Sequence, residues 1–188
     1  MVSVVIPAYN AALTIARNLE SIFAQTYPDF EVIVVDDGST DKTAEIVQSV
    51  SKRRRPSLRD GQPIILIRQE NRGAQAARNR GWEEVHRRPS PQPSPAGRGG
   101  LRTSPRPLGD GPAEGDYVLF CDADIVMIPT MLEKMVRALA THPDASYAYS
   151  SFKFGWKTFK LWPFDAQRLH KMPYIHTTSL ICASAFRV

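Results

Sequence analysis

The stretch "YVLFCDADIVM", Tyr117 to Met127, begins as a short apolar run and then turns acidic. Apolar runs of about four to eight residues without strict alternation are typical of strands buried on both faces of a parallel sheet. Asp122 and Asp124 follow at a spacing of two, which places both side chains on one side of an extended chain. Two carboxylates so close repel each other and raise one pKa unless a cation binds. The stretch therefore predicts a buried strand that ends in a cation site.

Three further runs have the same character and precede this one in the chain. They are "VSVVI" (2–6), "EVIVV" (31–35) and "PIILI" (63–67). Segments with helical spacing separate the runs, and strands that alternate with helices imply right-handed crossovers. The expected fold class is therefore α/β, a Rossmann-type α/β/α sandwich around a mostly parallel sheet.

The first predicted helix follows "PAYN", with Asn10 as its N-cap. Its apolar side is expected to contain Leu13, Ala16, Leu19 and Phe23.

Two more helix starts can be predicted from capping chemistry. After "DGST", either Ser39 or Thr40 is expected to cap a helix, with Asp41 in a first turn that favours negative charge. Pro129 suits a first helical position. The apolar positions that follow it at helical spacing are Leu132, Met135, Val136 and Leu139.

Length and composition fit one globular domain over residues 1–188, because 43% of the 188 residues are hydrophobic. No apolar run reaches the roughly 18 residues of a membrane-spanning helix, and the N-terminus does not resemble a signal peptide. Cys121 and Cys182 lie in apolar runs and are expected in the core. Two cysteines make a disulfide framework improbable and fit a reducing cytoplasm.

The net charge of +5 comes from the middle of the chain, since residues 51–115 hold 14 Lys and Arg against 6 Asp and Glu. The basic run "SKRRRPSLRDG" (51–61) suits a solvated loop, although phosphates or an anionic membrane are alternatives. Residues 88–115 contain 7 of the 15 prolines and 6 of the 11 glycines, with no aromatic residue. This composition cannot bury enough apolar surface to fold, so we expect a disordered Pro/Gly/Arg-rich insertion there.

The polar residues that follow the predicted strands indicate where a ligand would bind. In open α/β sheets, ligands bind outside the carboxyl ends of the strands. The segments expected at this edge are "PAYN" (7–10), "DDGSTD" (36–41), "RQENRGAQAARNRG" (68–81) and "DADI" (122–125). Carboxylate ligands completed by water or phosphate suit Mg²⁺ or Mn²⁺, and such an ion would neutralise a diphosphate.

Asp36 and Asp37 have two possible roles. Asp-Asp-Gly-Ser is good turn chemistry, and a carboxylate after a strand can also accept hydrogen bonds from a base or a ribose. Neither G-x-G-x-x-G nor a P-loop motif is present. A nucleotide would therefore be held by carboxylates, a metal and the backbone.

Four stretches, taken in their order along the chain, resemble the nucleotide-sugar half of a family 2 glycosyltransferase of GT-A fold. They are "VSVVIPAYNA", "VIVVDDGSTD", "ENRGAQAARNRG" and "GDYVLFCDAD". The resemblance covers Val2 to about Tyr149 without the insertion. It implies metal-dependent, inverting transfer of a sugar from a nucleotide diphosphate, commonly UDP, to a hydroxyl acceptor. Residues 1–188 would then be a single, incomplete GT-A domain, truncated at its C-terminus.

The resemblance also implies roles for individual residues. Asp124 would be the principal metal ligand, and Asp122 would support the metal or the ribose. Asp37 would bind uracil or ribose, and Arg78 would lie near the donor. The nucleotide-binding set it implies is Pro7, Ala8, Tyr9, Asn10, Asp36, Asp37, Arg78, Asp122 and Ala123. Tyr9 has an alternative as a buried core residue.

The general base of the family is expected beyond Val188, so no catalytic residue is assigned. His176 is a candidate in principle, and Asp165 suits a helix cap better. The apolar "SLICASAF" (179–186) is expected to need partners from further chain. The aromatic and basic "FKFGWKTFKLWPF" (152–164) fits a membrane-surface or acceptor-binding element, or a loop over the core.

The predicted partners are a nucleotide-diphosphate sugar and a saccharide or lipid-linked acceptor, in cell-envelope polysaccharide synthesis. The expected location is cytoplasmic, with peripheral contact at the inner face of the membrane. A non-catalytic nucleotide-sugar-binding remnant and a nucleotidyltransferase are the alternatives. Nucleic-acid binding is not expected, because the basic residues lie in predicted loops without interleaved aromatics.

Overall fold

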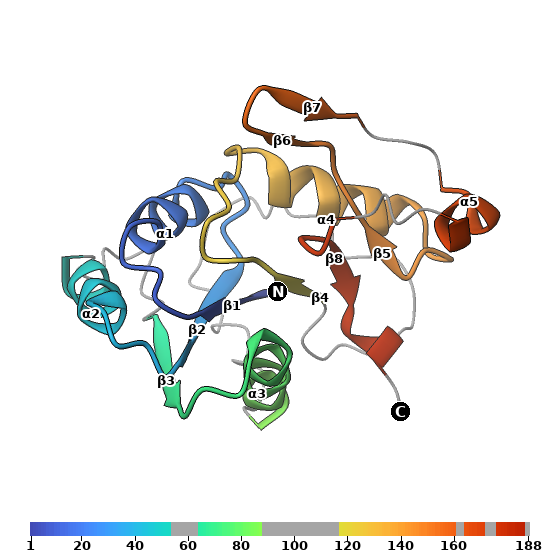
Figure 1. Ribbon diagram of the computed structural model, residues 1–188. Coiled ribbons are helices and arrows are strands. Elements are labelled where there is room, and N and C mark those ends of the chain that lie inside the picture. The colour runs from blue at the N-terminus through green and yellow to red at the C-terminus, as the bar shows by residue number, and fades with distance from the viewer. Residues whose placement is uncertain (54–63, 88–116, 161–163, 172–175, 187–188) are drawn as a thin grey trace, which may run out of the picture.

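The computed structural model describes residues 1–53, 64–87, 117–160, 164–171 and 176–186. The predicted insertion at 88–115 and most of the basic run at 51–61 lie outside the described residues. The elements, shown in Figure 1, are β1 (Val2–Ala8), α1 (Ile15–Phe23), β2 (Phe30–Asp37), α2 (Thr43–Arg53), β3 (Ile65–Gln69), α3 (Ala74–Arg87), β4 (Tyr117–Phe120), α4 (Met131–Thr141), β5 (Tyr147–Ala148), β6 (Phe152–Phe154), β7 (Lys157–Phe159), α5 (Ala166–Lys171), β8 (Leu180–Cys182) and the 3₁₀ turn η1 (Ala183–Phe186).

Within the described residues, six strands form one sheet in the order β3-β2-β1-β4-β8-β5. β1 pairs in parallel with β2 and with β4, and β2 pairs in parallel with β3. At the centre, Val5 lies opposite Ile33 on one side and Phe120 on the other. β8 pairs antiparallel with both β4 and β5. The mostly parallel α/β sheet predicted from the sequence is confirmed.

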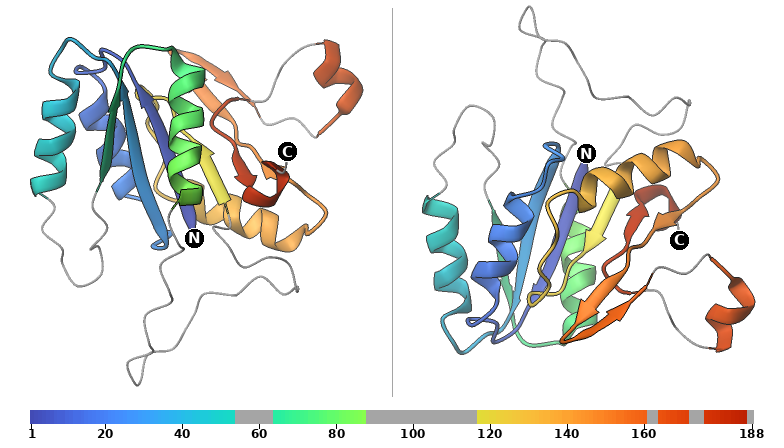
Figure 2. Two further views of the ribbon diagram at one scale, coloured as in Figure 1. Left: turned by 90° about the horizontal axis from the view of Figure 1, so that it is seen from below. Right: turned by 90° about the horizontal axis from the view of Figure 1, so that it is seen from above.

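Helices cover both faces of this sheet, so the molecule has three layers. α1, α2 and α4 lie on one face, and α3 covers the other (Figure 2). β1 is buried along its whole length because it is covered from both sides. Gly81 of α3 faces Val5, and a Cβ built at Gly81 would lie 2.3 Å from Val5 Cγ1. The absent side chain therefore allows α3 to pack close to the sheet.

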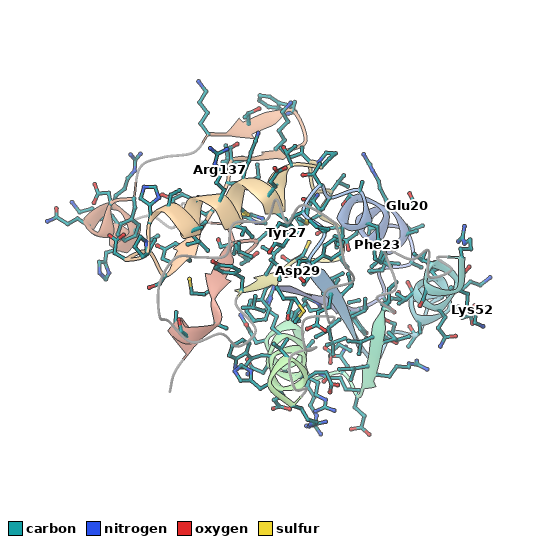
Figure 3. All side chains as sticks on the ribbon, turned by 180° about the vertical axis from the view of Figure 1, so that it is seen from behind. Glu20, Phe23, Tyr27, Asp29, Lys52 and Arg137 are labelled. Atoms are coloured by element: carbon teal, nitrogen blue, oxygen red, sulfur yellow. The ribbon has the colours of Figure 1, made fainter. Side chains whose placement is uncertain are left out.

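The amino ends of β1 and β2 are joined by structural contacts. The terminal amine of Met1 pairs with the Asp29 carboxylate at 3.3 Å, and Val2 N donates to Asp29 O at 2.9 Å. The ring of Phe23 lies 6.3 Å from that of Phe30, and Figure 3 labels Phe23 and Asp29 beside the strands. The polar side chains predicted to form the site lie at the opposite edge of the sheet, at the carboxyl ends of the strands.

The predicted helices form, but two of them begin later than their caps suggested. α1 starts at Ile15, Leu13 is 99% exposed, and Asn10 has a φ of +48° and is not a cap. α2 starts at Thr43, whose backbone N–H donates to Asp41 Oδ1 at 2.9 Å. Asp41, rather than Ser39 or Thr40, is therefore the capping side chain.

α4 agrees with its predicted apolar pattern more closely, but it too begins late. It starts at Met131 with Thr130 as N-cap, so Pro129 precedes the helix and is not its first residue. Its buried residues include the predicted Leu132, Met135 and Leu139.

The C-terminal segment finds part of its partners within the chain. β8 inserts between β4 and β5, and Leu180 is fully buried, whereas Ile181 and Cys182 are half-buried. That "SLICASAF" needs partners from further chain stays a prediction. Cys121 is buried as predicted, Cys182 is half-buried, and both thiols are free. In the part of the chain that the structure describes, no helix is long and apolar enough to cross a membrane.

Candidate functional site at the carboxyl ends of the parallel strands

The carboxyl ends of the four parallel strands meet at one edge of the sheet. Ala8 at the end of β1 lies opposite Asp36 of β2, and Asp36 lies opposite Arg68 of β3. Beyond β4, Cys121 N donates to Val5 O at 2.9 Å and keeps the chain beside β1. The polar segments that follow these strands therefore gather at a single edge, as predicted.

Asp36 is fully buried, and both of its carboxylate oxygens have partners within the chain. Oδ2 accepts from Arg68 Nε at 3.0 Å, and Oδ1 accepts from Ser39 N at 3.0 Å. Asp36 thereby ties β2 to β3 and closes the turn after β2. For Asp36, these contacts correspond to the structural role in a turn rather than to the binding of a base or a ribose.

Asp37 holds the loop between β3 and α3. Its Oδ1 accepts from Gln69 Nε2 at 2.8 Å and from Arg72 N at 2.9 Å, and its Oδ2 accepts from Gly73 N at 2.7 Å. Burial raises the pKa of Asp37, but the bonds from Arg72, Gln69 and Gly73 outweigh it, so this pKa lies below its ordinary value. Asp37 is 2% exposed, so its carboxylate accepts these three bonds almost entirely inside the protein.

The segment 7–10, which comprises the last two residues of β1 and the two that follow it, places two of its four predicted site residues at the surface. Pro7 and Ala8 are buried, whereas Tyr9 is 52% exposed and Asn10 is exposed. The alternative of a buried core Tyr9 is therefore wrong. Asn10 N donates to Ser39 Oγ at 3.0 Å, so Asn10 connects this segment to the loop after β2.

The Asp-Ala-Asp segment forms a turn, which corrects the prediction of an extended pair. β4 ends at Phe120, and Ile125 N donates to Asp122 O at 3.0 Å. Ala123 is buried within this turn, and Asp124 is exposed. The two carboxylates therefore have different surroundings.

Asp122 is held from two sides. Arg78 Nη2 of α3 donates to Asp122 Oδ1 at 2.6 Å, and Thr177 Oγ1 donates to Oδ2 at 3.3 Å. The Arg78 side chain is 16% exposed, and its Nε is buried without a hydrogen-bond partner among the described residues. The guanidinium is therefore held beside Asp122 through Nη2.

A cavity of about 240 Å³ opens beside this ion pair. It is lined by Gln75, Arg78, Asn79, Phe120 and Thr177. Amide, guanidinium and hydroxyl groups beside an aromatic ring suit polar ligands that carry hydroxyl or phosphate groups.

The two carboxylates of the turn fit a partial set of metal ligands. Within the described residues, no three His, Cys, Asp or Glu side chains gather as a complete metal site. Mg²⁺ is, however, usually held by one or two carboxylates, with phosphates and water completing the shell. Asp124 is exposed and has no hydrogen-bond partner in the part of the chain described, so its oxygens are available. The residues present therefore fit a divalent ion that shares its ligands with a diphosphate.

The neighbouring thiol is not part of such a ligand set. Burial raises the pKa of Cys121 to about 12, and the carboxylates of Asp122 and Asp124 also raise it, against the hydrogen bond from Asn18. Only the thiolate binds a metal, so a thiol that stays protonated at neutral pH is a core residue.

His176 and Asp165 have local partners. His176 Nδ1 accepts from Thr178 N at 3.0 Å, and its ring centroid lies 4.6 Å from that of Phe152. Asp165 Oδ1 accepts from Arg168 N at 3.0 Å at the start of α5, so the predicted helix cap is confirmed.

Sequence reasoning missed some residues that contact the site. Thr177 was not predicted, because nothing in the sequence indicates that it reaches Asp122 across 55 positions. Asn18 and Ser21 of α1 and Gln25 just after it were also missed, although their spacing of three and four is that of one side of a helix. That spacing was the available signal.

Comparison with known proteins adds a family and a fold to this geometry. The sequence profile of the family described as Glycosyl transferase family 2 matches residues 3–87 and 112–185. TuaG of Bacillus subtilis, a glycosyltransferase assigned by its name to teichuronic acid biosynthesis, is 38% identical over 136 residues, 72% of this chain and 40% of that protein. This chain spans between 32% and 41% of the length of three curated relatives.

Solved structures support the same fold. The structure of Staphylococcus aureus TarS 1–349 in complex with UDP has a TM-score of 0.64 at 20% identity, and the match covers 97% of this chain and 47% of that one. The mannosyltransferase PcManGT of Pyrobaculum calidifontis, in complex with GDP-Man and Mn²⁺, has a TM-score of 0.59 at 25% identity over 81% of this chain and 35% of that one.

Proposed function

Because this chain belongs to glycosyl transferase family 2, we propose that it binds the donor in an enzyme that transfers a sugar from a nucleotide diphosphate to a hydroxyl acceptor. UDP is the proposed nucleotide. The complex of TarS with UDP supports this choice. The complex of PcManGT with GDP-Man and Mn²⁺ supports a nucleotide-sugar donor together with a divalent ion.

The observation that carries the proposal is the unequal environment of the two carboxylates after β4. Asp122 is tied to Arg78 at 2.6 Å, whereas Asp124 is exposed beside it and without a partner among the described residues. Asp124 would be the principal ligand of Mg²⁺ or Mn²⁺, with Asp122 supporting the ion or the ribose. An ion bound there would neutralise the charge of the diphosphate leaving group.

The nucleoside would lie over the ends of β1 and β2. The exposed ring of Tyr9 offers a surface for the base. Asp37 is the proposed partner of a base N–H or a ribose hydroxyl, and because it is 2% exposed, the ligand would reach it only at the small open part of the residue. Pro7 and Ala8 are buried, so they would contribute backbone and shape rather than side-chain contacts. Asp36 would act by holding Arg68 and the turn.

The transfer itself is proposed to be a single displacement that inverts the configuration of the transferred sugar. Such a step requires a base that takes the proton of the acceptor hydroxyl. We assign no base among the described residues, because His176 Nδ1 already accepts a backbone hydrogen bond and Asp165 caps α5. We further propose that residues 1–188 form one domain. The family match in two segments on either side of 88–111 supports this proposal.

The nucleotide can be tested by calorimetric titration of UDP, GDP and ADP into the protein in the presence of Mn²⁺. We expect UDP to bind most tightly. Equal binding of all three would point to diphosphate recognition without a base pocket. If the folded protein bound none of them, the proposed donor site would be wrong.

The acceptor is proposed to be a saccharide or lipid-linked molecule of the cell envelope, at the inner face of the membrane. The name of TuaG supports a role in envelope polysaccharide synthesis. β6 and β7 support a membrane contact, because they form a separate two-stranded sheet whose exposed residues include Trp156 at 89% (Figure 1). This hairpin favours the membrane-surface reading over a loop that covers the core.

The charge of this hairpin favours an anionic lipid surface. Lys153, Lys157 and Lys160 are exposed, and the stretch from 152 to 164 contains no acidic residue. Lysines near an anionic surface contribute about 1 kcal/mol each, and Trp prefers the interface.

Co-sedimentation with vesicles tests this contact. A variant with Trp156→Ala, Lys157→Ala and Lys160→Ala should lose binding to vesicles of phosphatidylcholine and phosphatidylglycerol. Lys42→Ala with Lys52→Ala, which removes two exposed charges elsewhere, should retain most of it. Equal binding of both variants would exclude the hairpin as the lipid contact.

A further inference from the structure

The chain that carries Asp122 and Asp124 has no regular secondary structure between β4 and α4. Backbone N–H and C=O groups near a core must nevertheless find partners. Here most of these partners are side chains on one side of α1 and just after it. The conformation of the turn therefore depends on a helix more than 90 residues away in the sequence.

Asn18 makes the contacts closest to the carboxylates. It is fully buried, and its Nδ2 donates to Ile125 O at 2.7 Å and to Asp122 O at 3.2 Å. It also lies 3.5 Å from Cys121 Sγ. The reversed amide orientation would bring Oδ1 against two carbonyl oxygens, so these acceptors fix the orientation of the side chain. Asn18 thus binds both ends of the Asp-Ala-Asp turn.

Ser21 and Gln25 continue the same side of α1 along the chain. Ser21 Oγ accepts from Met127 N at 3.0 Å. Gln25 Nε2 donates to Ile128 O at 2.8 Å, and Gln25 Oε1 accepts from Leu132 N at 2.9 Å. The three side chains therefore bind the backbone from Asp122 to the first turn of α4.

Packing alone does not explain a polar residue at position 18. Asn18 lies next to the core residue Leu19, and its buried Oδ1 has no partner in the part of the chain that the structure describes. An unpaired buried polar atom is unfavourable, and an apolar side chain of similar size would avoid it. Its presence indicates a requirement for the shape of the turn rather than for the stability of α1.

We propose that Asn18, Ser21 and Gln25 are positioning residues, which hold the turn so that Asp124 points to solvent while Asp122 meets Arg78. One part of this inference rests on the proposed function: that the position of the turn sets the affinity for a nucleotide diphosphate with a metal. The geometric part, that these side chains fix the backbone of the turn, is independent of that function.

The test compares Asn18→Ala and Ser21→Ala with Ile22→Val, a core substitution in the same helix. The control tests whether lower stability alone weakens binding, and the urea midpoints of all three variants are measured alongside. Partners that orient metal ligands typically contribute about 10- to 100-fold to affinity. We expect a loss of this size for UDP with Mn²⁺ in Asn18→Ala, a smaller loss in Ser21→Ala, and wild-type affinity in Ile22→Val.

Amide hydrogen exchange of Met127 provides the readout that does not depend on ligand binding. In the wild type this amide should be protected, and Ser21→Ala should accelerate its exchange while Ile22→Val should not. Acceleration supports the inference even if the wild type binds no UDP, a result that would refute only the proposed function. Rapid exchange of Met127 in the wild type, or equal loss of affinity in Asn18→Ala and Ile22→Val, would overturn it.

Discussion

Asp36 and Asp37 are neighbours in the sequence, yet their carboxylates contact different parts of the molecule. Asp36 accepts from Arg68 and Ser39, whereas Asp37, which is also buried, accepts from the loop that leads into α3. At the scale of single residues, the first acid therefore belongs to the fold, and the second connects the fold to the proposed site.

Asp37→Asn should lower stability most strongly near neutral pH. The amide oxygen can replace Oδ1, but the amide NH₂ group would face Gly73 N, which would lose its acceptor. An unpaired buried donor costs about 1–3 kcal/mol. Urea denaturation of both proteins at neutral pH measures this difference.

The same variant has an expected pH dependence. The pKa of Asp37 is lowered in the folded protein, so its carboxylate stabilises the fold above the ordinary value of 3.8, and this contribution is lost as the pH falls through the folded pKa. The gap between wild type and Asp37→Asn should therefore shrink at acidic pH. A gap that stays constant down to about pH 2 would contradict the lowered pKa. Asp144→Asn, at an exposed position, serves as the control.

Only part of the residue-scale picture could be predicted from the sequence. The shared edge of Asp37, Asp122 and Asp124 follows from parallel strands, whose carboxyl ends must meet. The different surroundings of Asp122 and Asp124 could not be predicted, because they depend on Arg78 and Thr177, which come from distant parts of the chain.

At the scale of elements, the close approach of α3 to the sheet positions Arg78 over the end of β4. The approach depends on Gly81, since an added Cβ would lie 2.3 Å from Val5 Cγ1 and 3.4 Å from Val35 Cγ2. The helix that packs closely against β1 is therefore the one that carries Arg78, the partner of Asp122.

Gly81→Ala should force α3 away from β1, and overpacking of this kind typically costs about 1–3 kcal/mol. Val5→Ala would create space for the new methyl group, so the double variant should be more stable than the sum of the two single changes predicts. Chemical denaturation of the four proteins measures this coupling. Strict additivity would show that the helix does not pack on Val5 in this way.

The elements differ in how well the sequence predicted them. β1 to β4 are short apolar runs separated by segments with helical spacing, and this alternation was sufficient to predict them. β8 could not be predicted, because it contains three residues and pairs antiparallel with β4, about 60 positions away in the sequence. The starts of α1 and α2 were displaced because Asn10 and Ser39, the predicted caps, contact each other: Asn10 N donates to Ser39 Oγ, and neither side chain caps a helix.

At the scale of the whole molecule, the two edges of the parallel strands have different tasks. The amino ends are closed by contacts such as Met1 with Asp29 and Phe23 with Phe30. The carboxyl ends carry the acids, Arg78 and the cavity of about 240 Å³. A stable sandwich thus presents one polar edge, which suits a nucleotide diphosphate and a divalent ion.

The most direct test of this proposal is calorimetric titration of UDP with and without Mn²⁺, using the wild type, Asp124→Ala and the exposed control Asp144→Ala. We expect Mn²⁺ to strengthen UDP binding in the wild type and in Asp144→Ala, and to have little effect in Asp124→Ala. If Asp124→Ala bound UDP with the same dependence on Mn²⁺ as the wild type, Asp124 would not hold the metal, and the proposed site would be contradicted.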